Sequence, residues 1–178
     1  MLNLFPNKKL DVTLLRMAHE LIEKYGNFSQ TVMIGLQPRG VYFSQRMCQV
    51  LCDLMPEINI PYGELDVTFF RDDFRRRPAP LQANQTRIDF LIEGKKVILI
   101  DDVLYTGRTI RAAMDAMLAY GRPKSVDLMV LVDRVHNREL PVEASIVGIA
   151  VDTIQSQKVS VELRESGGND AVFLLNEG

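Results

Sequence analysis

The sequence is poor in cysteine, lacks tryptophan, contains no long apolar run and carries almost no net charge. Two cysteines, Cys48 and Cys52, are too few for the disulfide framework of a small secreted domain, which favours a reducing compartment. No uncharged stretch approaches the ~18 residues of a membrane-spanning helix, and the first residues do not form a basic region followed by an apolar one. We therefore expect a soluble, cytoplasmic protein without a membrane partner.

The charge balance and the missing motifs exclude further classes of protein. The 21 lysines and arginines against 23 aspartates and glutamates give a net charge of −2, so any nucleic-acid binding requires a local basic patch. Cys48 and Cys52 lie in a helical pattern with no histidine near them in sequence, which is more typical of packing residues than of metal ligands. The absence of a Gly-x-x-x-x-Gly-Lys-Ser/Thr loop, and of Gly-x-Gly-x-x-Gly after a strand, argues against a kinase, an NTPase or a dinucleotide-binding enzyme.

The chain alternates helical and strand patterns, which is typical of an α/β fold, and its length suits a single domain, residues 1–178. Apolar residues from 9 to 25 recur at steps of three and four, and Gly26 follows, which predicts an amphipathic helix. Further helices are predicted from the turn at 37–40 through Leu51 and from 108 to 120. Strands are predicted at residues 31–36, 65–69, 97–100, 126–132, 146–151, 159–163 and 172–175, with a hairpin turn at 167–170.

Residues 71–86 are predicted to form a long exposed loop. The segment is densely charged, includes the run Arg75, Arg76 and Arg77, and contains two prolines. It is longer than a simple connection requires, and loops of this length often act as lids. We therefore expect a flexible active-site loop over this range.

Residues 97–109 join an apolar run to two acids and then to a small, hydroxyl-rich turn that opens a helix. The four apolar residues predict a strand buried on both faces, so the polar residues lie at the carboxyl edge of a parallel sheet, where open α/β sheets bind ligands. The backbone N–H groups in the first turn of a helix attract anions, Gly107 allows close approach, and Thr106 and Thr109 add hydroxyl donors. The turn therefore predicts a binding site for one phosphate group.

Asp101 and Asp102 suit a sugar bound beside that phosphate. Because like charges repel, the two carboxylates are better placed as acceptors for vicinal hydroxyl groups than as contacts of the phosphate. The alternative is that one acid caps the following turn while the other pairs with an arginine. Together with the apolar strand and the turn, the pair indicates a sugar phosphate.

Residues 97–109 resemble the phosphoribosyl-diphosphate (PRPP) motif of type I phosphoribosyltransferases, in the form found in bacterial pyrimidine-operon attenuation regulators that are also uracil phosphoribosyltransferases. Segments 16–20, 35–40, 68–73, 121–123 and 138–141 resemble the same family, in the same order. The resemblance implies the type I phosphoribosyltransferase fold, a central, mostly parallel sheet flanked by helices, with a small β hood. It assigns PRPP binding to consecutive residues: Asp101, Asp102, Val103, Leu104, Tyr105, Thr106, Gly107, Arg108 and Thr109.

The resemblance also implies an activity, the transfer of ribose 5-phosphate from PRPP to uracil, which gives UMP and pyrophosphate. Mg²⁺ would accompany the diphosphate, with Asp101 and Asp102 as candidate contacts. Arg39 and Gly40 match the pyrophosphate loop of the family, and Arg71 is the strongest candidate to close over the diphosphate with the long loop and exclude water. The three arginines at 75–77 are more typical of a solvated segment.

Tyr105, Asp133 and Arg134 are the residues expected near the base. Purine-specific relatives carry an acid at the position of Tyr105, whereas a tyrosine has an ordinary pKa of about 10 and is neutral at pH 7. This difference favours a pyrimidine, with orotate or a purine as alternatives within the superfamily. No residue stands out as a general acid or base, and none is assigned.

The family also binds messenger-RNA leaders when it holds uridine nucleotides such as UMP or UTP, through a basic face on its dimer. Three residues of that face are retained: Arg16, His19 and Arg138. Three others differ, with Leu15 in place of a threonine, Glu143 in place of an arginine and Ile149 in place of a lysine. Lost phosphate contacts and an added carboxylate weaken binding to a polyanion, so we expect weak, salt-dependent binding to a pyrimidine-operon leader RNA.

The resemblance further implies a homo-oligomer, a dimer or a larger assembly, with the first helix as a candidate interface. The alternative function is a uridine-nucleotide-sensing, RNA-binding regulator of pyrimidine gene expression with weak enzyme activity. The two functions make different demands, because the enzyme requires the PRPP loop whereas the regulator requires the basic face.

Overall fold

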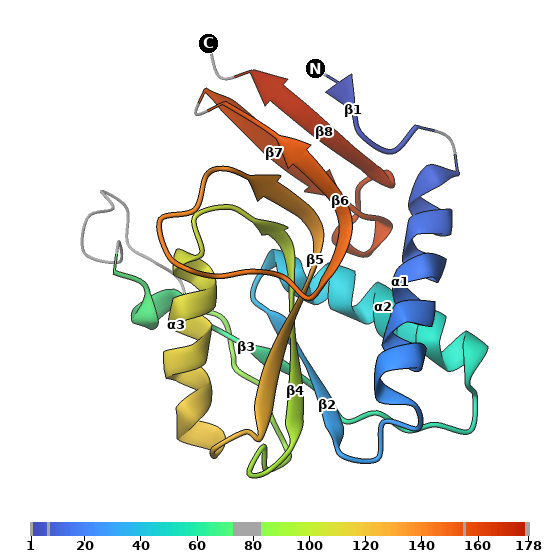
Figure 1. Cartoon of the computed structure of the whole chain (residues 1–178), viewed down its shortest axis with the longest axis vertical. Coiled ribbons are helices and arrows are strands. Elements are labelled where there is room, and N and C mark those ends of the chain that lie inside the picture. Colours follow the sequence, from blue (N-terminus) through green and yellow to red (C-terminus); the bar gives the residue numbers. More distant parts are fainter. Residues whose placement is uncertain (1, 7, 73–82, 155, 177–178) are drawn as a thin grey trace.

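A five-stranded parallel sheet forms the centre of the protein, in the order β3-β2-β4-β5-β6 (Figure 1). The computed structural model describes residues 2–6, 8–72, 83–154 and 156–176. The strands of this sheet are β2 (Thr31–Leu36), β3 (Tyr62–Leu65), β4 (Lys96–Leu104), β5 (Ser125–Val135) and β6 (Ile146–Asp152).

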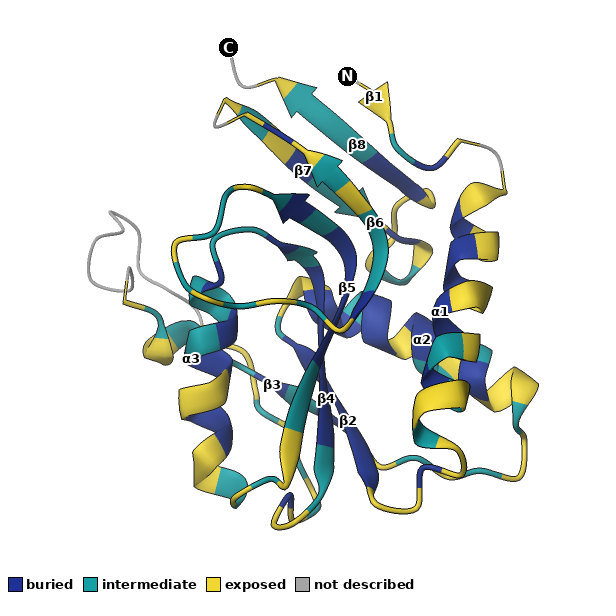
Figure 2. Ribbon diagram, viewed as in Figure 1, coloured by how far each residue is buried: buried dark blue, intermediate teal, exposed yellow. Residues whose placement is uncertain are grey.

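Helices cover both faces of the sheet, with α1 (Lys9–Tyr25) and α2 (Arg39–Leu54) on one face and α3 (Arg108–Met117) on the other (Figures 1 and 2). In β4, Ile98 and Ile100 pack beneath α1 and α2, whereas the alternate residues 97 and 99 pack beneath α3. Successive side chains of a strand point to opposite faces, so a strand covered on both sides must be apolar at each of these positions. The apolar run at 97–100 is a central strand for this reason.

A second, antiparallel sheet lies beyond the carboxyl ends of the parallel strands, in the order β1-β8-β7 (Figure 1). Val159, Leu163 and Val172 are buried in the same core as α1 and α2, which fixes this small sheet on the main body. We call it the hood. It consists of β1 (Leu2–Asn3), β7 (Gln157–Glu162), the 3₁₀ helix η4 (Arg164–Ser166) and β8 (Ala171–Asn176).

Most of the predicted elements are confirmed. The helix at 9–25 is α1, the strand at 31–36 is β2, and the helix predicted at 108–120 is α3 followed by the 3₁₀ helix η3 (Leu118–Tyr120). The later strands at 146–151, 159–163 and 172–175 are β6, β7 and β8 with small shifts of their ends. The short strand β1 was not predicted.

The prediction of a strand at 65–69 is wrong. β3 ends at Leu65, and the 3₁₀ helix η1 (Thr68–Phe70) follows it. The cause is Asp66, whose Oδ1 accepts hydrogen bonds from the backbone N–H and the hydroxyl of Thr68, at 3.2 and 2.6 Å. A side chain that bonds the backbone two residues on turns the chain out of the sheet.

β4 and β5 are longer than predicted, because each is paired beyond its apolar run. Asp101 pairs with Val130 of β5, and Asp133 of β5 pairs with Ala150 of β6. The acids expected after these strands therefore lie within them.

Part of the predicted loop at 71–86 cannot be compared. Residues 73–82, including the arginines at 75–77, lie outside the described residues, and the rest of the segment contains neither a helix nor a named strand. Within the described ranges, every helix is too short or too polar to span a bilayer.

Candidate functional site

The strand order creates a point where neighbouring connections run in opposite directions. From β2 the chain crosses to β3 on one side, whereas from β4 it crosses to β5 on the other. Loops that diverge in this way leave a crevice at the carboxyl edge of a sheet, where ligands of open α/β folds bind. The two segments predicted to bind phosphate groups both lie beside this crevice: residues 37–40 follow β2, and residues 105–109 follow β4.

Gly40 brings the first turn of α2 against β4. A Cβ atom at this position would lie 2.6 Å from the carbonyl oxygen of Ile100 and 3.0 Å from Cα of Asp101. Only a residue without a side chain allows this approach. Arg39, the preceding residue, is thereby held near the acids of β4, and its charge acts on Asp102.

Asp101 and Asp102 are both buried, with 9 % and 7 % of their surfaces exposed. Oδ1 of Asp101 accepts the backbone N–H of Asp102 at 3.0 Å, and Oδ1 of Asp102 accepts that of Val103 at 2.8 Å. Burial raises the pKa of Asp101, and repulsion from Asp102 raises it further. Burial also raises the pKa of Asp102, although the charge of Arg39 opposes this shift.

One oxygen of this pair is left for a ligand. Among the residues that the structure describes, Oδ2 of Asp102 has no hydrogen-bond partner, although it is shielded from solvent. Buried polar atoms are almost always paired, since an unpaired one costs about 1–3 kcal/mol. An orphaned acceptor at the edge of the crevice therefore marks a place where a hydroxyl donor or a cation would be stabilised.

The turn before α3 has the conformation expected of a phosphate site. Gly107 has φ of +89°, a left-handed conformation that favours glycine, and it precedes the first residue of α3. The carbonyl oxygen of Thr106 accepts the N–H groups of Glu139 and Leu140 at 3.0 and 3.2 Å. A Cβ on Gly107 would lie 3.1 Å from Cγ2 of Val142, so the segment after β5 supports the turn from behind.

Two arginines from different segments lie at the turn of residues 105–109, which we call the phosphate turn after its predicted role. Nη1 of Arg71 donates to Oγ1 of Thr109 at 2.9 Å, which brings the start of the predicted loop to the first turn of α3. Arg108 pairs with Asp72, and its Nε lies 2.5 Å from Oε2 of Glu139. The structure thus brings Arg71 to the predicted phosphate site. The guanidinium of Arg108 is instead paired with two carboxylates.

The side chains expected near the base are engaged within the protein. Arg134 is 5 % exposed, and its guanidinium carbon lies 3.8 Å from the centre of the Tyr105 ring. Nε of Arg134 donates to the hydroxyl of Thr153 at 2.9 Å, and Nη2 donates to the carbonyl oxygen of Gln157 at 2.8 Å. Arg134 therefore joins the phosphate turn to the chain that leads into the hood.

Two of the three residues predicted to face RNA, Arg16 and Arg138, contact other parts of the chain. Nη2 of Arg16 donates to the carbonyl oxygens of Val147 and Gly148 at 2.9 and 2.7 Å, and Nη1 pairs with Glu20. Arg138 pairs with Asp133, and its Nη1 donates to the carbonyl oxygen of Tyr105 at 2.5 Å. Arg138 thus supports the phosphate turn. His19, Leu15 and Glu143 are exposed, and Ile149 is half-buried.

The sequence did not reveal the hood side of the site. A cavity of about 230 Å³ has Arg39, Tyr42 and Asp102 on one wall. The opposite wall belongs to the hood and comprises residues 160–163 and 166. No local pattern marks these residues, because they reach the site only through packing of the hood on α2.

Comparisons with known proteins identify the fold. The family model for the phosphoribosyl transferase domain matches residues 3–166 of the sequence. The hypoxanthine phosphoribosyltransferase of Trypanosoma cruzi superposes with a TM-score of 0.74 at 17 % identity, covering 99 % of this chain and 97 % of the other. That of Staphylococcus aureus gives a TM-score of 0.70 at 17 % identity, over 96 % and 90 %. The fold is that of the type I phosphoribosyltransferases.

Relatives of higher sequence identity show which family of phosphoribosyltransferases the chain belongs to. The "Bifunctional protein pyrR" of Enterococcus faecalis is 44 % identical over 161 residues, 90 % of this chain and 89 % of the relative. The "Bifunctional protein PyrR" of Desulfosudis oleivorans is 45 % identical over 168 residues, 93 % and 91 % of the two chains. The "Pyrimidine operon regulatory protein" of Lactococcus lactis is 45 % identical over 162 residues, 91 % and 90 %. The chain belongs to the PyrR family of phosphoribosyltransferases.

Proposed function

We propose that this protein transfers ribose 5-phosphate from PRPP to uracil and releases UMP and pyrophosphate. The observation that carries the proposal is the buried acid pair of β4, with the unpaired Oδ2 of Asp102, beside the glycine turn that opens α3. Membership of a phosphoribosyltransferase family supports the same reaction class. Tyr105 in place of an acid supports a pyrimidine base.

In this proposal, each part of PRPP meets a different element. The 5-phosphate binds the first-turn N–H groups of α3 with Thr106 and Thr109, since a helix N-terminus favours anions. The ribose hydroxyls donate to Asp101 and Asp102, whose negative charge also favours the oxocarbenium-like carbon formed as the bond to pyrophosphate breaks. Arg39 and the N–H of Gly40 hold the departing pyrophosphate, and Arg71 adds a second cation.

We further propose that Mg²⁺ enters with the diphosphate, whose negative charge it neutralises when bound. Carboxylate oxygens are the ligands that Mg²⁺ prefers, and the unpaired oxygen of Asp102 fits this requirement. Within the described part of the chain, no group of three or more acidic, histidine or cysteine side chains is gathered around one point. The remaining ligands would therefore come from the diphosphate and water, with Asp101 and Asp102 as the protein's contribution.

Replacing the acid pair tests the site. The variant Asp101→Asn/Asp102→Asn should lose at least about 100-fold in UMP formation, because the charge that stabilises the transition state is removed. The loss is measured as the rate of UMP formation from PRPP and uracil. Parallel assays with orotate, hypoxanthine and guanine test the choice of base. Asp53→Asn, an exposed residue at the end of α2, is the matched control and should retain full activity. Normal activity of the double variant would refute the site assignment.

A second function, regulation of pyrimidine genes, is favoured by the name of the Lactococcus lactis relative. In this alternative, a homo-oligomer that holds UMP or UTP binds a leader RNA and the transferase activity is minor. We expect weak binding that falls steeply with salt, because Glu143 and Ile149 stand where the resemblance implies cations, and Arg138 is paired with Asp133. Nanomolar, uridine-nucleotide-dependent binding at physiological salt, with slow UMP formation, would favour the regulator instead.

A further inference from the structure

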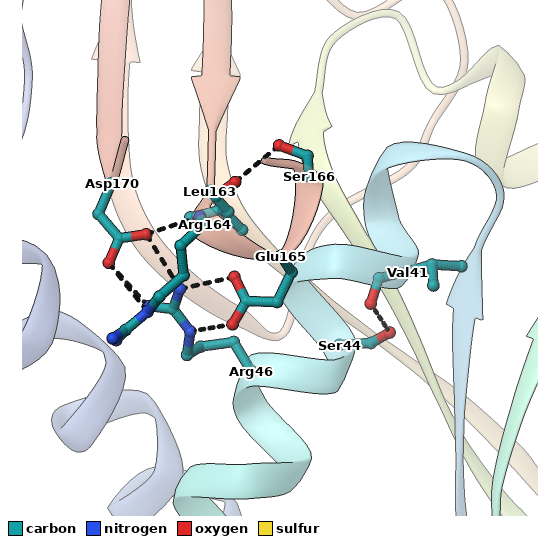
Figure 3. Close-up of polar contacts among 8 residues, drawn as sticks. All are labelled: Val41, Ser44, Arg46, Leu163, Arg164, Glu165, Ser166 and Asp170. Atoms are coloured by element: carbon teal, nitrogen blue, oxygen red, sulfur yellow. Dashed lines mark hydrogen bonds and ion pairs between the residues drawn. The ribbon is translucent and has the colours of Figure 1, made fainter. Parts of the chain in front are cut away.

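A buried arginine joins the hood to the main body close to the candidate site. Arg46 lies in α2 and is 6 % exposed. Its Nη2 lies 2.6 Å from Oε2 of Glu165 and 2.9 Å from Oδ1 of Asp170, and its Nε and Nη1 bond the second oxygens of the same carboxylates (Figure 3). The guanidinium is therefore shared between two carboxylates in forked geometry, the arrangement in which charged hydrogen bonds are strongest.

Both carboxylates belong to the turn that connects β7 with β8. Glu165 lies in η4, and Asp170 immediately precedes β8. Oδ1 of Asp170 also accepts the backbone N–H of Arg164 at 3.0 Å, so the same carboxylate holds the turn in shape. Hydrogen bonds from Arg46 lower the pKa of Asp170, which keeps this carboxylate charged at neutral pH.

The same turn and helix supply the two walls of the cavity at Asp102. Leu163 and Ser166 of the turn lie on the hood wall, whereas Arg39 and Tyr42 of α2 lie on the other. Arg46 is seven residues after Arg39, about 10 Å along the helix axis at 1.5 Å per residue. A fixed contact between Arg46 and the turn therefore sets the spacing of the two walls.

We infer that Arg46 is a positioning residue for phosphoribosyl transfer, because its pairs with Glu165 and Asp170 hold the hood wall at the spacing that PRPP requires. This inference rests on the proposed function. The acid pair and the phosphate turn lie on β4 and α3, outside the hood, so their chemistry survives when the hood is released. Bound substrate must then draw the hood back into place, which weakens apparent binding but leaves turnover at saturation intact.

Arg46→Met is the informative variant. Methionine retains most of the length of the side chain, and the two carboxylates that lose their partner are 21 % and 28 % exposed, so water can solvate them. Removing the carboxylates instead would leave a buried cation unpaired, the more damaging change. Arg46→Lys retains the charge but cannot bond both carboxylates in a fork, and it serves as a second variant if Arg46→Met does not fold.

Arg164→Met is the matched control, because Arg164 pairs with the same Asp170 at 3.4 Å but its side chain is 67 % exposed. Exposed pairs contribute little to stability. Steady-state kinetics with PRPP and uracil, calorimetric titration of PRPP, and amide hydrogen exchange in β7 and β8 are measured for the wild type and the three variants.

We expect Arg46→Met to raise KM and Kd for PRPP at least about tenfold, with kcat within about twofold and faster exchange in the hood. Arg46→Lys should be intermediate, and Arg164→Met unchanged. Unchanged PRPP affinity would overturn the inference. A lower kcat at constant KM would also overturn it, because that pattern indicates a smaller fraction of folded enzyme rather than a misplaced hood. If the wild type binds PRPP but forms no UMP, the proposed function fails while the affinities still test Arg46. If it does not bind PRPP, both fail.

Discussion

At the scale of single residues, the acids at the end of β4 carry a cost in stability, which the proposed function would explain as a gain in binding. Burial and mutual repulsion raise the pKa of Asp101, which means that its charged form is unfavourable in the folded protein. Perturbed carboxyl groups of this kind gather at functional sites. They lie at the crevice between β2 and β4, where Oδ2 of Asp102 has no partner among the described residues, and the proposed function would account for their cost in stability.

Asp101→Asn should therefore stabilise the folded protein at neutral pH. A carboxyl group whose folded pKa is raised penalises folding above that pKa, and the penalty disappears as pH falls through the ordinary value of 3.8. The melting temperature of the variant should exceed that of the wild type by a few degrees at pH 7 to 8, where about 2–4 °C corresponds to 1 kcal/mol in a chain of this size. The two curves should converge near pH 4. A lower melting temperature at neutral pH would contradict the assignment of Asp101 as a strained acid.

At the scale of elements, the site depends on how β4 is joined to α3. Gly107 has a left-handed backbone, and the segment 139–142 packs behind it. Arg138, immediately before that segment, donates to the carbonyl oxygen of Tyr105, so the turn is held from both ends. A rigid turn presents the N–H groups of α3 to a phosphate without ordering them on binding.

Gly107→Ala should weaken PRPP binding, because the added Cβ meets Val142 at 3.1 Å and the backbone must leave its left-handed conformation. Gly94→Ala is the control, since Gly94 also has a positive φ (+69°) but, apart from its chain neighbours, no described residue lies within 4 Å of its Cβ position. Both variants should lose roughly 1–2 kcal/mol of stability. Only Gly107→Ala should raise KM for PRPP, by about tenfold. Equal KM values in the two variants would show that the turn does not bind the donor.

The same scale shows how far local sequence reasoning reaches. Helix α1 follows from apolar periodicity, strands β2 and β4 follow from short continuous apolar runs, and the conformation at the start of α3 follows from Gly107. The strand predicted at 65–69 fails because Asp66 bonds Thr68 and turns the chain, a contact that alternation of apolar residues does not reveal. The extension of β4 and β5 to their acids depends on pairing with neighbouring strands, which the sequence of one strand does not contain.

At the scale of the whole molecule, three arginines join distant segments of the described chain. Arg16 ties α1 to the edge strand β6, Arg134 ties β5 to the approach of the hood, and Arg46 ties α2 to the hood itself. Planar, multiply bonding guanidinium groups suit such joints better than lysine. The hood can therefore lie over the crevice in one orientation although its sheet shares no strand with the main sheet.

The sequence by itself determined the buried central strand, the acid pair and the glycine turn, because a continuous apolar run and helix-end chemistry operate within a few residues. Only the tertiary structure decided which cations face the site and which are paired internally. The partners of Arg46 lie 119 and 124 residues away, and the carbonyl oxygens that Arg16 bonds lie 131 and 132 residues away. Contacts over such separations leave no local pattern, because they form only when the sheet, the helices and the hood have packed.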